Sequence, residues 1–211
     1  EKYRKLSMDL SMLTLQFDQN ALKDKNRFEL LITDENELSG LPESARDAAA
    51  MLAKSKDKDG WLFNLSAPSY IPFMRYSDKR DLREKMYREY MSVGNKGDEF
   101  DNKDIIKKIV NIRLEIAQLM GFKNYAEYAL EHTMAKNSAN VYKLLNQLLE
   151  AYKPIAINEY NAVEGFALGT EKENITVMPW DWSYYSEKLR DIRFKVNDEM
   201  TRPYFELSNV K

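Results

Sequence analysis

Cysteine is absent from the 211-residue sequence, and histidine occurs once, at position 132. Without cysteine the chain can form no disulfide, offers no thiolate nucleophile and cannot ligate a metal through sulfur. With one histidine it cannot build a zinc peptidase helix, which needs two histidines four residues apart and a carboxylate. A Ser-His-Asp relay would have to use His132, and an ordinary surface histidine is the favoured interpretation.

Long apolar runs and strong charge are also missing. No stretch of about 18 apolar residues is present, so we expect no membrane span. The net charge of -2 and the pI of about 5.7 argue against nucleic acid as the main partner, because phosphate binding needs a clustered positive field. Neither a phosphate-binding glycine loop nor a G-x-S-x-G motif occurs. Residues 55–60 partly imitate a calcium loop, but the twelfth position is Ser66 where a glutamate is required, so a charged turn is favoured.

The stretch from Phe100 to Lys153 carries the clearest helical periodicity. Its first part spaces apolar residues four and three apart, as one helix face requires: Ile105, Ile109, Ile112, Ile116 and Leu119. Asp101 is expected to cap this helix and Gly121 to end it. A second helix is expected over 124–132. A third begins at Ser138 and carries Val141, Leu145, Leu148, Tyr152 and Ile155. We expect the three to form an antiparallel helical core.

The residue pattern of the whole chain predicts a mainly α, multi-helix domain with two or three short strands. We expect residues 1–211 to form one helical fragment. Helices are expected over 2–24 (stripe Tyr3, Leu6, Leu10, Leu13, Phe17), 42–54, 77–91 and 180–194, with strands at 28–33 and 61–66 that can pair. Pro68 and Pro72 predict a turn, Pro154 a kink, Gly165 and Gly169 a loop, 175–178 an extended segment and Asn197 a last helical turn. Apolar residues close to both ends (Tyr3 and Leu6; Tyr204, Phe205 and Leu207) predict that the chain continues in a longer protein.

The most unusual local cluster is Trp180-Asp181-Trp182 followed by Tyr184 and Tyr185. Aromatic rings beside a carboxylate could line a peptide- or sugar-binding cleft, which makes Asp181, Tyr184 and Tyr185 the candidate substrate-channel residues. The alternative is an N-cap aspartate between core tryptophans. The residue chemistry alone favours this alternative.

Several motifs, in the same order as in a known family, cover nearly the whole chain: LSGLPESARDAAA (38–50), LMGFKNYAEYALEHTMAKN (119–137) and WDWSYYSEKLRDIRF (180–194), among others. They resemble the M3, thimet oligopeptidase-like family of zinc metallopeptidases, and most of all its peptidyl-dipeptidase branch. The resemblance implies one lobe of a two-lobed, zincin-type helical body whose deep channel admits short peptides, and release of C-terminal dipeptides.

In that family an HEFGH helix and a downstream glutamate hold zinc, and the helix glutamate activates the metal-bound water. This sequence has no HEFGH, so we expect no catalytic residue and no metal ligand in it. The resemblance instead implies channel wall and scaffold, with zinc in the parent enzyme, short peptides as substrates and a separate C-terminal catalytic half as partner. A cytoplasmic location is expected, with the periplasm left open. The rival hypothesis is a non-catalytic helical interaction module, and an HExxH motif within roughly the next hundred residues of the gene would decide against it.

Overall fold

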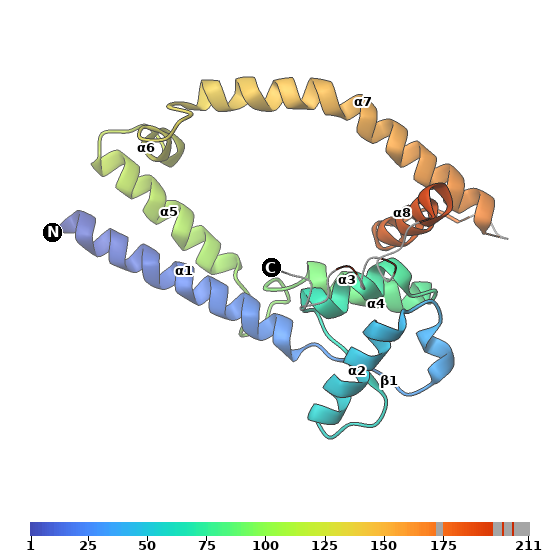
Figure 1. Cartoon of the computed structure of the whole chain (residues 1–211). Coiled ribbons are helices and arrows are strands. Elements are labelled where there is room, and N and C mark those ends of the chain that lie inside the picture. The colour runs from blue at the N-terminus through green and yellow to red at the C-terminus, as the bar shows by residue number, and fades with distance from the viewer. Residues whose placement is uncertain (172–174, 196–199, 201–203, 205–211) are drawn as a thin grey trace. The chain divides into compact units, whose positions relative to one another are not determined.

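The computed structural model describes residues 1–171, 175–195, 200 and 204 (Figure 1). Within these residues the chain has eight α-helices, one 3-10 helix and one two-stranded antiparallel sheet, so the mainly α prediction is confirmed. The residue contacts divide the chain into two compact units. Unit 1 comprises Glu1–Glu29 and Glu89–Ile157, and unit 2 comprises Leu30–Arg88 and Asn158–Lys211. The expected end cap at Asn197 lies outside the described residues.

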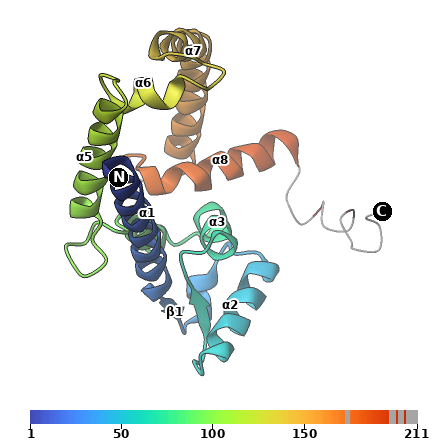
Figure 2. The same cartoon turned by 90° about the vertical axis from the view of Figure 1, so that its left-hand side faces the viewer.

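Unit 1 is built on two long helices, α1 (Lys2–Arg27) and α5 (Lys103–Leu119), which lie side by side (Figures 1 and 2). The stripe predicted for α5 forms the contact, since Ile105, Ile109 and Ile116 are buried. Leu119, expected on the same stripe, is exposed. It is the last residue of the helix.

Polar side chains fix the loop that leads into α5. The fully buried Asp24 of α1 accepts a hydrogen bond from the Gly94 amide at 2.7 Å and pairs with Arg27 and Lys96. Asp101 accepts from the Lys103 amide at 2.9 Å, so it serves the first turn of α5 as predicted, although the N-cap position itself is Asn102. After α5 come α6 (Tyr125–Leu130), capped by Asn124, and α7 (Ser138–Thr170).

Unit 2 contains the sheet and most of the buried apolar residues. Strands β1 (Leu30–Ile32) and β2 (Trp61–Phe63) pair with Leu31 opposite Leu62, as the sequence allowed. A short 3-10 helix, η1 (Glu35–Leu38), and helix α2 (Glu43–Ser55) lie between the strands, and α2 packs on β2. Helix α3 (Ala67–Tyr76) packs against α8 (Pro179–Phe194), with α4 (Arg80–Met91) between them in sequence.

Two elements differ from the prediction, and packing explains both. The expected Pro68–Pro72 turn is helix α3: Pro68 occupies its first turn, where a missing N–H costs nothing, and buried Phe73 packs edge-on against Phe63 at 4.8 Å. The expected loop at Gly165 and Gly169 lies inside α7. There Val163 and Ala167 are buried against Tyr184 and Tyr185, and this burial outweighs the cost of about 1 kcal/mol for each helical glycine.

The prediction of a three-helix core at α5, α6 and α7 is wrong for its third member. Four of the five stripe residues of α7 (Leu145, Leu148, Tyr152 and Ile155) are exposed. Amphipathic spacing predicts that a helix has an apolar face, but it does not identify the surface that covers that face. Among the described helices, none combines the length and the hydropathy needed to cross a bilayer.

Candidate functional site

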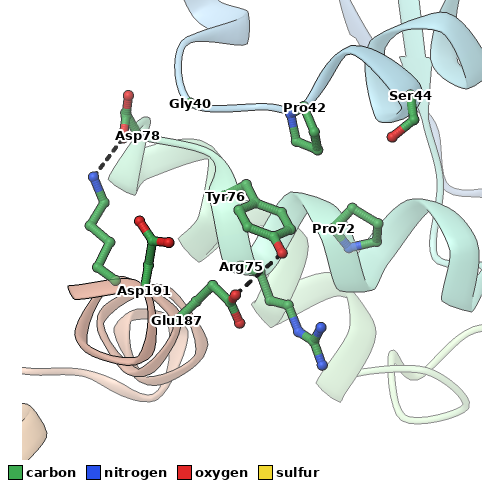
Figure 3. Close-up of a pocket in the computed structure, with 10 residues that line it drawn as sticks. Gly40, Pro42, Ser44, Pro72, Arg75, Tyr76, Asp78, Glu187 and Asp191 are labelled. Atoms are coloured by element: carbon green, nitrogen blue, oxygen red, sulfur yellow. Dashed lines mark hydrogen bonds and ion pairs between the residues drawn. The ribbon is translucent and has the colours of Figure 1, made fainter. Parts of the chain in front are cut away.

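A pocket of about 430 Å³ in unit 2 lies where the loop before α2, the end of α3 and one face of α8 converge (Figure 3). Its lining combines two prolines and a tyrosine ring with charged groups of both signs. The lining residues are Gly40, Pro42, Ser44, Pro72, Arg75, Tyr76, Asp78, Glu187, Lys188 and Asp191. A cavity of this size, mostly apolar with a few convergent polar groups, is the usual form of a small-ligand or peptide-side-chain site.

Gly40 allows the loop to form this wall. Its φ is +84°, and a Cβ at this position would lie 2.1 Å from the Tyr76 carbonyl oxygen. Any other residue would be strained and would push the loop away from the end of α3. The close approach therefore brings Pro42 of the loop and Tyr76 of α3 into the lining of one cavity.

The acidic side of the pocket comes from α8. Glu187 is only 8% exposed, accepts a hydrogen bond from the Tyr76 hydroxyl at 3.3 Å and pairs with Arg190. Asp191 lies one turn later and is exposed. No hydrogen bond or ion pair of the Asp191 side chain is found within the described part of the chain, so this carboxylate is available to a ligand.

Asp78 and Lys188 form a second polar cluster on the same pocket. The Tyr184 hydroxyl and the Ser39 hydroxyl each donate to Asp78 at 2.7 Å, and the Lys188 ammonium lies 3.3 Å from it. Burial would raise the pKa of Asp78, but these hydrogen bonds and the nearby ammonium outweigh it, so its pKa lies below the ordinary value. Burial likewise opposes the charged form of Lys188, yet contacts with Tyr184 and Asp78 raise its pKa. Both groups are therefore charged at neutral pH.

Asp181, the first of the three predicted channel residues, is completely buried in an ionic network. It accepts hydrogen bonds from Arg80 at 2.7 Å, from Arg83 at 2.9 Å and from the Met178 amide at 3.0 Å. Asp181 is the third residue of α8, and its side chain accepts a hydrogen bond from the backbone amide of Met178, the N-cap residue. It therefore stabilises the start of the helix, as the cap interpretation expected, although it is not the N-cap residue itself. Burial tends to raise the pKa of Asp181, and the bonds from Arg80, Met178 and Arg83 lower it overall.

Arg83 is the buried cation that balances this carboxylate. Its side chain is 1% exposed, its guanidinium donates to the Ser77 carbonyl at 2.7 Å, and it stacks 3.9 Å from the centre of the Tyr184 ring. The network joins α4 to the start of α8 and thereby sets the orientation of the α8 face that lines the pocket.

Tyr184 and Tyr185, the other two predicted residues, are also buried in this chain. Tyr185 donates to Glu171 and packs with Phe166, and burial together with that carboxylate raises its pKa. Tyr184 contacts two pocket-lining residues: its hydroxyl donates a hydrogen bond to Asp78, and the Lys188 ammonium lies 4.5 Å from the centre of its ring. The three residues are thus buried near the start of α8, and none of them lines the pocket.

Residue patterns did not identify the pocket residues Asp78, Glu187, Lys188 and Asp191. The last three lie within the motif 180–194, but charged residues on a helix usually form its solvent-exposed face, so they gave no signal of a pocket. The facing wall of the pocket comes from residues more than a hundred positions earlier, which a local pattern cannot show.

His132 is 91% exposed and lies beside Glu131. In the described part of the chain, no three His, Cys, Asp or Glu side chains form a group able to hold a metal ion. The residues that the structure describes therefore do not fit a zinc site.

A family model, described as peptidase family M3, matches residues 73–211. The chain belongs to this family, as the resemblance predicted. Oligopeptidase A of Haemophilus influenzae is 39% identical over 100% of the chain, and oligopeptidase A of Escherichia coli is 37% identical over 97%. Dipeptidyl carboxypeptidase of Escherichia coli is 29% identical over 99% of the chain.

The chain covers 31% of the length of each of these three relatives. Identity is higher with the two oligopeptidases A than with the dipeptidyl carboxypeptidase. The family prediction is confirmed, and these values place the chain nearer to oligopeptidase A than to the branch that the motifs suggested.

Proposed function

We propose that this chain is a non-catalytic part of a longer zinc metallopeptidase that hydrolyses short peptides. The observation that carries the proposal is the family match over 73–211 in a chain whose described residues contain no cluster of metal ligands. The zinc ligands and the water-activating glutamate then belong to the part of the protein that corresponds to the rest of the relatives' length. The partners are short peptides and that catalytic part, and the proposed location is the cytoplasm.

Within the parent enzyme we assign the chain to one lobe, where it forms scaffold and part of the channel wall. The pocket beside α8 supports this assignment, because it offers an apolar cleft with an available carboxylate at Asp191. Asp181, Tyr184 and Tyr185 contribute from behind the wall: Asp181 anchors the start of α8, and Tyr184 holds Asp78 in place. A peptide ammonium or basic side chain is the group that Asp191 would bind.

Two modes of cleavage follow from the relatives' names. Release of C-terminal dipeptides is the mode of a dipeptidyl carboxypeptidase, and cleavage of oligopeptides without that restriction is the alternative. The higher identity with oligopeptidase A favours the second mode. Mass spectrometry of the products of one decapeptide, blocked at its N-terminus and free at its C-terminus, separates the two, because only the first mode yields a ladder of dipeptides from the C-terminus.

The test of the wall assignment uses the complete protein with Asp191→Asn, and Glu150→Gln as a matched control on an exposed carboxylate of α7. We expect Asp191→Asn to raise KM for a basic peptide several-fold with little change in kcat, since it removes a binding contact remote from the zinc. The control is expected to match wild type. Identical kinetics in the two variants would show that the pocket does not contact the substrate. Absence of any peptide hydrolysis in the zinc-loaded complete protein would instead refute the enzyme assignment and favour the interaction module.

A further inference from the structure

Residues 142–161 of α7 form a long helical segment without one buried residue. Eight large apolar side chains within it are each between 43% and 61% exposed, and six of them share one sector of the helix: Leu144, Leu145, Leu148, Leu149, Tyr152 and Ile155. Isolated exposed apolar residues need no explanation, but a continuous apolar patch on a protein surface usually marks an interaction site. We call these six residues the α7 apolar face.

The α7 apolar face covers a wide sector of the helix. At 100° per residue, its members spread over about 140°, and the opposite side carries Lys143, Asn146, Gln147, Glu150 and Lys153. A helix that lies on a single surface needs an apolar stripe of roughly 100°. The wider sector fits a helix seated in a groove between at least two other elements.

Among the described residues, α7 does not pack extensively against α1, α5 or α6, the other helices of unit 1. The buried apolar side chains of unit 1 in that part of the chain are Ile105, Ile109, Ile116 and Ala117, all on α5. The buried apolar residues of unit 2, in contrast, come from the sheet and from α2, α3, α4, α7 and α8. Unit 2 therefore has a core of its own, whereas the helices of unit 1 present much of their apolar surface outward.

We propose that the α7 apolar face is the docking surface for the catalytic part of the complete peptidase. This inference rests on the proposed function and specifies where its partner binds. The relatives are about three times as long as the matched segment, since the chain covers 31% of each. A partner segment on the same polypeptide is present in every molecule at high effective concentration, so it competes well against a second copy of the chain.

The absence of cysteine from the chain makes the proposal directly testable. Leu148→Cys places a thiol on the α7 apolar face, and Gln147→Cys places the matched thiol in the same turn but 100° away, among the polar residues. Each variant is prepared as the 211-residue chain and as the complete protein. The rate of alkylation is then read by the mass of the peptide that contains the new cysteine.

We expect alkylation of Leu148→Cys to be at least about tenfold slower in the complete protein than in the 211-residue chain, because only an accessible thiolate reacts. Gln147→Cys is expected to change less than about twofold. Equal rates for Leu148→Cys in the two forms would overturn the proposal. Protection that already occurs in the 211-residue chain and rises with its concentration would overturn it in favour of a second copy.

Hydrogen exchange of the unmodified proteins provides the readout that needs no variant. Amides of 141–157 should exchange more slowly in the complete protein, since packing suppresses local opening of a helix. Peptide hydrolysis by the same preparations tests the proposed function separately. A preparation that hydrolyses peptides while 141–157 stays unprotected would refute the docking surface alone, and one that protects 141–157 without hydrolysis would refute the activity alone.

Discussion

Replacing Asp181 is the substitution whose effect on stability the structure predicts most directly. Asp181→Ala leaves Arg83, which is 1% exposed, as a buried guanidinium without its carboxylate. Arg80 is 42% exposed, so water can solvate its guanidinium when Asp181 is removed, and the loss of this second ion pair adds little to the destabilisation. Removing one member of a buried ion pair typically costs about 3–5 kcal/mol, and we expect a loss in this range. For a protein of this size such a loss lowers Tm by roughly 6–20 °C.

Tryptophan fluorescence provides the assay, because Trp61, Trp180 and Trp182, the three tryptophans of the chain, all belong to unit 2. Denaturant unfolding followed by this signal reports the unit that contains the ion pair. Glu84→Ala is the matched control: it breaks the exposed Glu84–Arg88 pair on the same helix and should cost only about 0.3–0.5 kcal/mol.

A double-mutant cycle tests the reason for the effect. Arg83→Met removes the stranded charge with little change in volume, so Asp181→Ala with Arg83→Met should be less destabilised than the sum of the two single changes, by about 1–3 kcal/mol. Strict additivity, or an Asp181→Ala loss below about 1 kcal/mol, would refute the view that this pair holds α8 to α4.

The remaining predictions concern packing, backbone and pH. Ile116→Ala should destabilise unit 1 by about 2–5 kcal/mol through the cavity it leaves against α1, measured by circular dichroism; an unchanged midpoint would contradict the packing. Gly94→Ala should cost more than about 1 kcal/mol, because its φ is +71° and a Cβ would lie 3.0 Å from Asn102, whereas Gly165→Ala inside α7 should be neutral or stabilising. Since the pKa of Asp181 is lower folded than unfolded, its contribution is complete above about pH 4 and is lost as pH falls further; Asp181→Asn should lack this part of the acid dependence.

The sequence predicted the elements whose signals are local. Apolar spacing located α1 and α5, the turn residues bracketed β1 and β2, and motifs identified the family. It missed α3 and the glycine-containing end of α7, because the packing of Phe73 on Phe63 and of Val163 on Tyr185 overrides local propensity.

The candidate site could be predicted only in part. Asp181, Tyr184 and Tyr185 were selected for their chemistry, but all three are buried, and Tyr184 reaches the pocket through its hydrogen bond to Asp78. The pocket itself depends on the close approach of Gly40 to the end of α3, where a Cβ on Gly40 would lie 2.1 Å from the Tyr76 carbonyl oxygen. No local sequence pattern encodes this contact. Which charged residues of α8 point into a cavity depends on the elements that α8 meets.

Zinc affinity and peptidase activity of the 211-residue chain, measured beside the complete protein, test the central claim most directly. We predict that calorimetric titration finds no submicromolar zinc site in the chain, because it has one exposed histidine and no cysteine, and the carboxylates of its described residues form no cluster of ligands. The chain should not cleave a blocked short peptide, whereas the zinc-loaded complete protein should. Submicromolar zinc binding by the chain, or cleavage by it that His132→Ala abolishes, would contradict the account.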